Sequence, residues 1–292
     1  MNQSASTSNA HGKSIHLTRR VAILVTLWLA LEPALFAWGP EGHRIVATIA
    51  FQLLPEAIKT QVEDILGDED FVEVSNWADV VRLSRPQTKD WHFVDIPVTE
   101  AMYDQQRDCQ TLETGDCAIA ELARARAVLN DRTQPVKARH EALKFIIHFV
   151  GDIHQPLHSA TNGSRENGDR GGNSVNTRLL THTMKLHAAW DHGLIELDDR
   201  DESEYADGLI DQFVKTEEVS DTWTVVDWVN EAPGLAVDVG YKYPGFKANV
   251  IPAQKVMLGQ AYVNRAKPVV DLQLARAGVR LARLLQDTLG AQ

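Results

Sequence analysis

The sequence predicts a mainly α protein, a single globular domain of packed helices with a few short strands. Apolar residues recur at helical spacing over most of the chain, whereas strand signals are few and short. No internal repeat, low-complexity segment or linker divides the chain, and its 292 residues are enough for one large core.

The predicted helices follow one another with short interruptions. The first covers 43–53, where Ile45, Ile49 and Leu53 share a face, and it ends before Pro55. Further helical patterns cover 56–66, 118–131, 137–151, 184–197, 201–217 and 269–288. The last has an apolar stripe opposite several arginines, which is the pattern of an ordinary core-packing helix.

Extended segments are fewer. Residues 173–180 are expected to form one arm of a hairpin, while 91–96 fits either a strand or a loop. The Gly- and Asn-rich stretch 162–173 is expected to be a loop, and loops of this length in compact domains are often functional. Its Asn162-Gly-Ser164 fits the acceptor pattern for N-glycosylation, which matters only in a eukaryotic host.

The first 37 residues have the pattern of an export signal. Residues 1–20 are polar and basic, and 21–31 are nearly all apolar. This run is too short to span a bilayer and typical of a signal peptide, with an uncleaved membrane anchor as the alternative. Cleavage after Ala37 would leave one domain, 38–292. We therefore expect an exported protein, periplasmic or secreted according to the host.

The two cysteines fit an oxidising compartment. Cys109 and Cys117 are eight residues apart in a polar stretch that contains Gly115. A disulfide that closes this loop is expected, with two free thiols as the alternative. A cysteine metal site is disfavoured because the sequence has no further thiol to complete one.

The net charge of −11 limits the possible partners. The sequence lacks the basic footprint of a protein that binds duplex nucleic acid tightly. If the substrate is a phosphodiester, bound metal must therefore supply most of the local positive charge.

Two stretches in the middle of the chain indicate metal chemistry. Residues 146–158 read IIHFVGDIHQPLH, and 186–192 read LHAAWDH. Each contains a histidine four residues before an aspartate, so that both side chains share one helix face and can hold one divalent cation. One such pair is a weak signal. The two pairs together with His158 predict a metalloenzyme with more than one metal ion; the pairs are His148 with Asp152 and His187 with Asp191.

Taken with four further segments, these motifs resemble the zinc-dependent, single-strand-specific nucleases of the S1/P1 type from fungi, plants and bacteria. Those enzymes are related in fold to bacterial zinc phospholipase C. The matching segments run in family order from residue 38 to about 191: Trp-Gly-x₃-His at 38–43, Trp-Ala-Asp-x₂-Arg at 77–82, His-Phe-Val-Asp at 92–95, His-Phe-Val-Gly-Asp-Ile-His-Gln-Pro-Leu-His at 148–158, Gly-Gly-Asn at 171–173 and Leu-His-x₂-Trp-Asp at 186–191.

The resemblance implies a cluster of three zinc ions. The first ion would be held by Asp79, His92, His148 and Asp152, and the second by His158, His187 and Asp191. The third would take His43, Asp152 as a bridge, and the free amino group and carbonyl of Trp38. Because that amine exists only after cleavage behind Ala37, export processing would complete the third site.

The resemblance also implies an activity. The enzyme would hydrolyse single-stranded DNA and RNA to 5′-phosphate products and act as a 3′-nucleotidase, without stable duplex binding. It would be a monomer with no membrane attachment after processing. Asp79 would orient or deprotonate the attacking water. Arg82 would neutralise charge on the phosphate, with a surface salt bridge as its alternative role.

A base pocket is part of the same expectation. Phe93 would stack on an unpaired base, and Asp95 and Asn173 would bind the base edge. Alternatively, Asp95 caps a turn and Asn173 stabilises its loop. His154, His182 and His192 fall outside the ligand pattern and are expected to have other roles.

Two other functions compete with the nuclease. Zinc phospholipase C shares the ligand pattern but, by family pattern, has a glutamate where this chain has Asp191. A non-enzymatic zinc-binding protein would need neither Arg82 nor a base pocket.

Overall fold

The structure is a computed structural model that describes Met1 and residues 38–109, 117–216 and 224–290. The expected signal peptide and its cleavage site after Ala37 lie outside these residues, apart from Met1. Contacts divide the chain into two units, and the second, Leu35–Gln292, contains every helix and strand of the described part. Within that part, no helix combines the length and apolarity needed to cross a membrane.

The second unit is mainly α, as the sequence predicts. Its α-helices are α1 (Pro40–Leu53), α2 (Glu56–Leu66), α3 (Trp77–Val81), α4 (Gln105–Asp108), α5 (Ala118–Asn130), α6 (Val136–His154), α7 (Leu186–Ala188), α8 (Glu202–Leu209), α9 (Val225–Leu235) and α10 (Gln260–Gly290). The 3₁₀ turns η1 (Glu73–Asn76) and η2 (Pro86–His92) flank α3, and π-helical turns extend α7, α8 and α9 as η3 (Ala189–Gly193), η4 (Ile210–Val214) and η5 (Ala236–Gly240).

The predicted helix boundaries are wrong in two places. The last helix begins at Gln260, whereas the sequence places its start at 269. A proline usually marks a helix end, but Pro268 lies inside this helix. The helix predicted at 184–197 begins only at Leu186, since His182–Lys185 is a strand. No predicted helix corresponds to α9, whose sequence includes Pro233.

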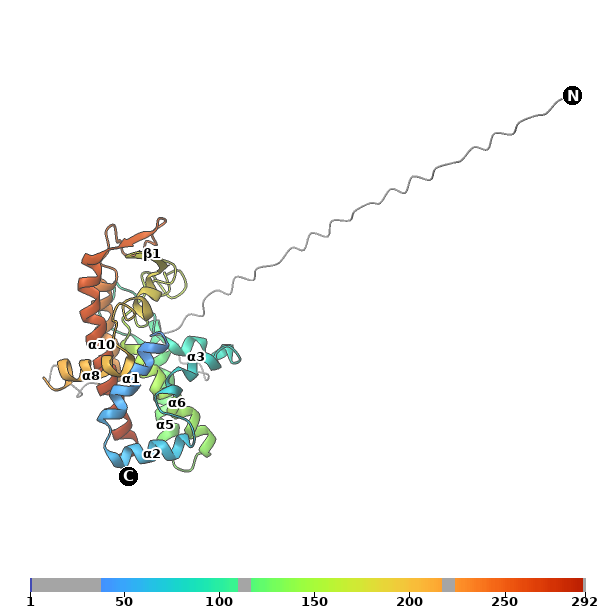
Figure 1. Ribbon diagram of the computed structural model, residues 1–292, viewed down its shortest axis with the longest axis vertical. Coiled ribbons are helices and arrows are strands. Elements are labelled where there is room, and N and C mark those ends of the chain that lie inside the picture. The colour runs from blue at the N-terminus through green and yellow to red at the C-terminus, as the bar shows by residue number, and fades with distance from the viewer. Residues whose placement is uncertain (2–37, 110–116, 217–223, 291–292) are drawn as a thin grey trace. The chain divides into compact units, whose positions relative to one another are not determined.

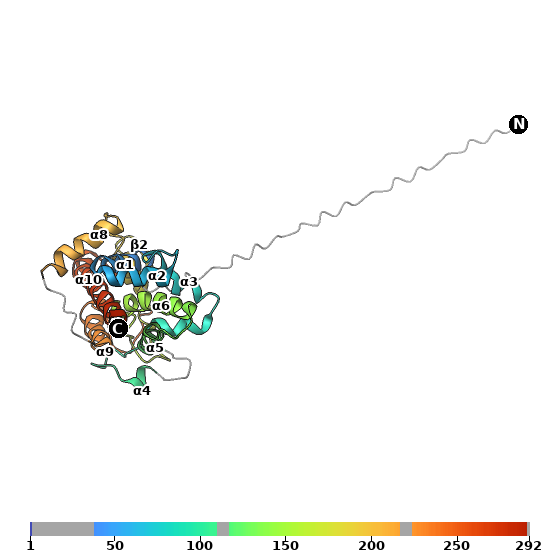
Figure 2. The same ribbon diagram turned by 90° about the horizontal axis from the view of Figure 1, so that it is seen from below.

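Helix α6 lies at the centre of the unit. Every residue from Ala142 to His154 is buried, because α2, α3, α5, α9 and α10 contact α6 from different sides. Figure 2 shows α6 between α2 and α5. Polar groups on a helix without a solvent-facing side must be paired or bound, and this requirement applies to His148, Asp152 and His154.

A small sheet lies beside α10, near the end away from the C-terminus (Figure 1). Its strands are β1 (Asn176–Leu179), β2 (His182–Lys185) and β3 (Val256–Leu258), in the order β2-β1-β3. Strands β1 and β2 form the expected hairpin, with Asn176 opposite Lys185, and β3 pairs parallel to β1.

The segment of uncertain prediction, 91–96, runs beside residues 158–161 outside this sheet. The Val94 amide donates to the His158 carbonyl at 2.7 Å, and the Thr161 amide donates to the Ile96 carbonyl at 2.8 Å. A single parallel bridge, between Pro97 and Thr161, continues this pairing. The pairing brings the two motifs that contain His92 and His158 together.

The loop at 162–173 is anchored to the C-terminal part of the unit. The Asp169 carboxylate accepts hydrogen bonds from the Asn162 amide at 3.0 Å and from the Tyr241 hydroxyl at 2.9 Å. The Asn162 side chain is 1% exposed and bonds to the backbone of Asn249 and Val250. A glycan on Asn162 is therefore incompatible with this fold.

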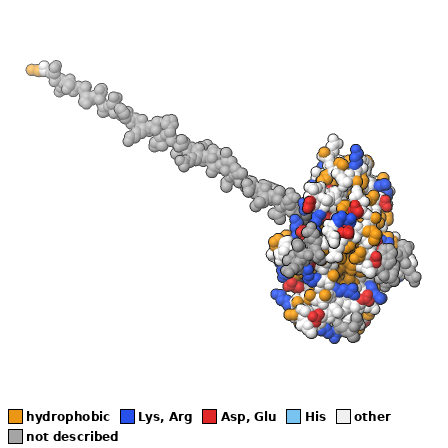
Figure 3. Space-filling model, turned by 180° about the vertical axis from the view of Figure 1, so that it is seen from behind, with side chains coloured by type: hydrophobic (Ala, Val, Ile, Leu, Met, Phe, Trp, Pro, Cys, Tyr) orange, Lys and Arg blue, Asp and Glu red, His pale blue; other side chains and the backbone are white. Residues whose placement is uncertain are grey.

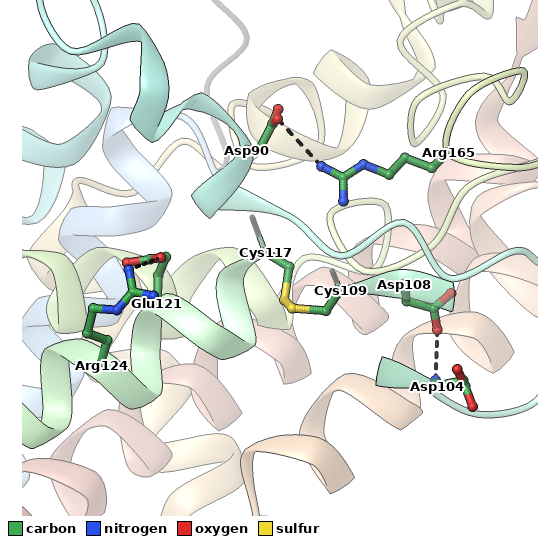
Figure 4. Close-up of a disulfide and its surroundings, with 8 residues drawn as sticks. All are labelled: Asp90, Asp104, Asp108, Cys109, Cys117, Glu121, Arg124 and Arg165. Atoms are coloured by element: carbon green, nitrogen blue, oxygen red, sulfur yellow. Dashed lines mark hydrogen bonds and ion pairs between the residues drawn. A yellow bond between two sulfur atoms is a disulfide. The ribbon is translucent and has the colours of Figure 1, made fainter. Parts of the chain in front are cut away.

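Cys109 and Cys117 form the disulfide that the sequence predicts. Figure 4 shows this bond at the start of α5. The first amide of α5, that of Ala118, donates to the Phe93 carbonyl at 3.1 Å. The disulfide therefore fixes the part of α5 against which Phe93 rests.

The surface agrees with the absence of a basic footprint in the sequence. Figure 3 shows Lys and Arg side chains interspersed with Asp and Glu side chains over the visible face. No broad cationic stripe crosses the described residues on that face.

Helices α1 and α10 approach closely at Gly278, which yields a stability prediction. A Cβ on Gly278 would lie 2.4 Å from Ile49 Cγ2 and 3.2 Å from the Val46 carbonyl of α1. We expect Gly278→Ala to lower the free energy of unfolding by about 1–3 kcal/mol through overpacking, despite the better helix propensity of alanine. Urea denaturation measures this change.

Gly234 in α9 provides the matched control, since a Cβ there would meet nothing within 4 Å. Gly234→Ala should raise the free energy of unfolding by about 0.5–1 kcal/mol. Equal stability of the two variants would contradict the close approach of α1 and α10.

Candidate metal centre

The histidines and aspartates expected to bind metal converge on one side of α6. They come from segments far apart in the sequence, and each is at most 5% exposed. The contributing elements are α1 (His43), α3 (Asp79), η2 (His92), α6 (His148, Asp152), the segment after α6 (His158), α7 (His187) and η3 (Asp191). Their ligand atoms form three overlapping or adjacent groups that could hold metal ions.

The first group surrounds the end of the α6 motif. Asp152 Oδ2 lies 3.0 Å from His92 Nδ1 and 3.4 Å from His148 Nε2. Asp79 Oδ1 lies 3.8 Å from each of the same two ring nitrogens. Three of the four residues that the resemblance assigns to one ion, His92, His148 and Asp152, therefore form one candidate group, whereas Asp79 is grouped with His43 and His148.

The second group joins the α6 motif to α7. His158 Nε2 and His187 Nε2 are 2.9 Å apart, and they lie 3.8 Å and 3.6 Å from the two oxygens of Asp191. Asp191 belongs to the π-helical turn η3, a type of irregularity that is frequent at functional sites.

The third group lies where the described part of the chain enters α1. His43 Nε2 lies 3.3 Å from Asp152 Oδ1, and the His43 ring stacks on His148 with 3.9 Å between ring centroids. Trp38 is fully buried, and the next amide, that of Gly39, donates to the Asp191 carbonyl at 2.7 Å. This bond places the beginning of the expected mature chain against the cluster.

Backbone carbonyls orient three of the imidazole rings. The Nδ1–H groups of His148, His158 and His187 donate to the carbonyls of Ser75, His92 and Gly171 at 2.6, 2.8 and 2.6 Å. Each ring then presents its Nε2 lone pair to the neighbouring aspartate. Metal-binding histidines are commonly held in this way through their second nitrogen.

The Gly-Gly-Asn motif supplies one of these carbonyls. Gly171 has a φ of +60°, and a Cβ there would lie 2.0 Å from the Leu157 carbonyl. Only glycine therefore allows this backbone to pass between Leu157 and His187 and to accept the His187 hydrogen bond.

Burial of these ionisable groups costs folding free energy when no cation is bound to them. It raises the pKa of Asp79 to about 7 and lowers the pKa of His148 to about 3, because neither charged form is solvated there. In the described part of the chain, His43 Nε2, Asp79 Oδ1 and Asp152 Oδ1 are buried without a hydrogen-bond partner. Neutral imidazoles and carboxylates are the donors that zinc prefers, so these residues fit the metal that the resemblance implies.

Arg82 faces the cluster from the end of α3. Its Nη1 lies 3.4 Å from Asp79 Oδ1, and its side chain is only 10% exposed. Arg82 also lines a cavity beside the cluster, which is described below. The ion pair between Arg82 and Asp79 is therefore part of that cavity and is not a bridge on the open surface.

A cavity of about 260 Å³ opens next to the metal-binding residues. His92, His158 and His187 contribute to its wall, as do the three residues of the expected base pocket, namely Phe93, Asp95 and Asn173. Asn173 also has the alternative role considered for it, because its amide donates to the Arg170 carbonyl at 2.9 Å. Burial raises the pKa of Asp95 to about 6, although nearby Arg165 opposes this shift.

Several residues of the site do not stand out in the sequence. Gln155 donates to Asp191 Oδ1 at 2.6 Å and thereby fixes that carboxylate. Lys89, Asp90, Arg165 and Arg170 line the cavity. The length and position of the loop at 162–173 could have indicated its two arginines, whereas sequence offers no signal for Lys89 and Asp90.

The remaining histidines point elsewhere, as expected. His154 is buried on the far side of α6, where its ring bonds to the Val150 carbonyl at 2.7 Å and to Arg280 at 3.0 Å. His182 is exposed on β2, and His192 pairs with Glu196 at 3.0 Å.

A helical domain with buried histidines and aspartates beside a cavity defines the class of metal-binding hydrolases. Comparison with known families narrows this class, because the model described as S1/P1 Nuclease matches residues 38–290. The chain belongs to the S1/P1 nuclease family. It is therefore a nuclease, a hydrolase that acts on phosphodiester bonds.

Curated relatives match nearly the whole chain. Endonuclease 2 of Arabidopsis thaliana is 30% identical over 306 residues, which cover 96% of this chain and 100% of the relative. Nuclease S1 of Aspergillus oryzae is 30% identical over 295 residues, covering 90% and 96%. Nuclease P1 of Penicillium citrinum is 26% identical over 291 residues, covering 87% and 99%.

The buried cluster predicts that metal removal destabilises the protein. Incubation with a strong zinc chelator should lower the melting temperature by about 5–10 °C, the shift expected when a ligand present at roughly 100 times its Kd is withdrawn from a domain of this size. Differential scanning calorimetry measures the change.

Zinc should restore the melting temperature, whereas Mg²⁺ should not, because Mg²⁺ prefers oxygen ligands to imidazoles. A melting temperature that is the same with and without chelator would contradict metal binding by this cluster.

Proposed function

We propose that the protein is an exported, zinc-dependent endonuclease that hydrolyses single-stranded DNA and RNA to 5′-phosphate products and also acts as a 3′-nucleotidase. One observation carries the proposal. Three of the buried histidines line a cavity that is also lined by an aromatic ring, a carboxylate and an amide. Hydrolytic and base-binding groups can therefore contact adjacent parts of one nucleotide.

The assignment of ligands follows the family resemblance, and the group of His158, His187 and Asp191 in the structure coincides with one of its three sets. Asp79, His92, His148 and Asp152 would hold one zinc ion, and His158, His187 and Asp191 a second. His43, Asp152 and the main chain of Trp38 would hold the third. The 3.3 Å separation of His43 and Asp152 supports the bridging role of that carboxylate.

The mechanism rests on Asp79 and Arg82. Zinc, when bound, supplies positive charge and lowers the pKa of a coordinated water towards neutrality. The Asp79 carboxylate accepts a proton from the attacking water or orients it, and the Arg82 guanidinium donates hydrogen bonds to the phosphate oxygens. Because the two side chains are 3.4 Å apart, both can act at the same phosphorus.

Single-strand preference follows from the cavity. A base can contact Phe93, Asp95 and Asn173 only if its stacking face and pairing edge are free, which excludes bases inside a duplex. The chain has a net negative charge, so it provides no general attraction for the sugar-phosphate backbone of a duplex that would replace the lost base contacts. Substrates would therefore be captured close to the metals.

Export is part of the proposal because of Trp38. A signal peptide ending at Ala37 would release the Trp38 amine next to Asp152 and His43. The position of Gly39, whose amide bonds to Asp191, supports this arrangement. The processed domain, 38–292, would act as a monomer in the periplasm or outside the cell, without membrane attachment.

Phospholipase activity is the less favoured alternative. In zinc phospholipase C the family pattern has a glutamate where this chain has Asp191. The presence of Asp95 and Asn173 in the cavity wall supports a nucleotide instead of a lipid. A purely storage role for zinc leaves the open cavity and Arg82 without a purpose.

The proposal is tested on protein that begins at Trp38. Zinc content and hydrolysis of single-stranded DNA, RNA, 3′-AMP and phosphatidylcholine are measured together. We expect about three zinc ions per chain with cleavage of the nucleotide substrates. Lipid hydrolysis alone would assign the protein to the phospholipase branch, and the absence of both zinc and turnover would refute the cluster assignment.

A variant with one alanine added before Trp38 is the matched control. In this variant the free amino group belongs to the added alanine. The nitrogen of Trp38 becomes a peptide nitrogen, which is a poor ligand. We expect it to retain about two zinc ions, because the other two groups are unchanged.

The pKa of Asp95 predicts a pH dependence of base binding. Burial raises this pKa to about 6, so the carboxylate is ionised above pH 6 and protonated below it. An ionised carboxylate accepts hydrogen bonds from a base edge, and this capacity is lost as pH falls through 6. Below pH 6, the ratio of the KM for 3′-AMP to the KM for ribose 3-phosphate, which lacks the base, should rise by up to about tenfold for each unit by which the pH falls.

Asp95→Asn should remove this relative dependence between pH 5 and 7. The ratio of the two substrates cancels any effect of protons on the metal ligands. An Asp95→Asn profile identical to that of the wild type would show that Asp95 does not bind the base.

A further inference from the structure

Arg165 covers the ring that is expected to stack on the base. Its guanidinium carbon lies over Phe93, 6.0 Å from the ring centroid. Arg165 belongs to the loop at 162–173, whereas Phe93 follows η2, so two different walls of the cavity meet at this contact. An aromatic ring and a planar cation are therefore neighbours in the lining of this cavity.

An ion pair holds Arg165 in this position. Its Nη2 lies 3.5 Å from Asp90 Oδ2, and Figure 4 shows the side chain extended towards Asp90. Asp90 is in η2, three residues before Phe93. The side chain is 28% exposed, so Arg165 is restrained by Asp90 while the surrounding solvent still allows it to move.

The spacing indicates what could enter between Arg165 and Phe93. Two stacking contacts, each at the usual separation of carbon atoms, need roughly 7–8 Å between the outer planes. The distance of 6.0 Å from the guanidinium carbon to the ring centroid is an upper limit on the present separation, so the gap must widen by at least about 1–2 Å. A small outward movement of the loop side chain, with Asp90 still within reach, would admit one flat ring.

We propose that Arg165 is a specificity-determining residue that forms the second wall of the nucleobase subsite, so that the base lies between Phe93 and the guanidinium. This inference rests on the proposed nuclease function. The planar, weakly hydrated guanidinium stacks on aromatic faces in a way that an ammonium group does not. In the free enzyme, Arg165 shields Phe93 from water, and the arriving base exchanges one cation–π contact for two stacking contacts.

Stacking on Arg165 is compatible with base binding by a carboxylate of the same cavity. Asp90 and Asp95 both line the cavity, and Arg165 lies close enough to act electrostatically on each. The positive charge of Arg165 favours the ionised form of Asp95, whose carboxylate can then accept hydrogen bonds from the base edge. A base stacked on Arg165 and bonded to Asp95 is thus held by its face and its edge simultaneously.

The test compares a substrate that has a base with one that lacks it. Steady-state kinetics with 3′-AMP and ribose 3-phosphate are measured for the zinc-loaded wild type, Arg165→Ala and Arg165→Lys. Arg170→Ala removes the same charge from the same cavity and serves as the matched control. Melting temperatures verify that each variant is folded.

We expect Arg165→Ala to raise the KM for 3′-AMP about 5- to 100-fold, the range observed when a base-stacking side chain is lost, with kcat unchanged. The KM for ribose 3-phosphate should stay within about twofold. Arg165→Lys should recover little of the loss, because lysine retains the charge but not the plane. Arg170→Ala should change both substrates by the same factor.

Three results would overturn the inference while the nuclease function stands. Full recovery in Arg165→Lys, or an equal rise in KM for both substrates in Arg165→Ala, would assign Arg165 to the phosphate. Unchanged KM values for both substrates in Arg165→Ala would remove it from the subsite. If the wild type hydrolyses neither substrate, the proposed function fails, and this inference fails with it.

Discussion

The structure depends on one constraint, the burial of ionisable histidines and aspartates against the part of α6, Ala142–His154, in which every residue is buried. At the end of α6, His148 and Asp152 meet Asp79 and His92, and all four side chains are buried. Such groups cannot all be charged, nor can they all be satisfied by one another. A bound divalent cation resolves this conflict, and the orientation of the surrounding groups is consistent with that role.

The neighbouring backbone is arranged to hold these ligands, including parts of the chain that contain no recognisable motif. Tyr241 bonds to Asp169 and anchors the loop whose Gly171 carbonyl orients His187. From α10, the Tyr262 hydroxyl accepts a hydrogen bond from Trp190 Nε1 at 2.7 Å, next to Asp191. The C-terminal third thus contacts the segments that contain the proposed metal ligands, although it provides none of those ligands.

Helical spacing predicted the helical class, and the spacing and compartment of the two cysteines predicted the disulfide. The His-x₃-Asp pairs predicted metal binding, whereas the complete set of proposed ligands came from the resemblance to the nuclease family. Sequence failed where tertiary packing decides. Pro268 lies inside α10, and the strand at His182–Lys185 forms because β1 pairs with it. Arg165 and Asp90 gain their roles only through the meeting of two distant segments, for which a single sequence contains no signal.

The most direct test of the metal cluster is anomalous diffraction at the zinc absorption edge, from crystals of the chain that begins at Trp38. The account predicts three peaks: one between Asp79, His92, His148 and Asp152, one between His158, His187 and Asp191, and one beside His43 and the Trp38 amine. Absence of a peak among the ligands of α6, or zinc only at surface histidines such as His182, would contradict it.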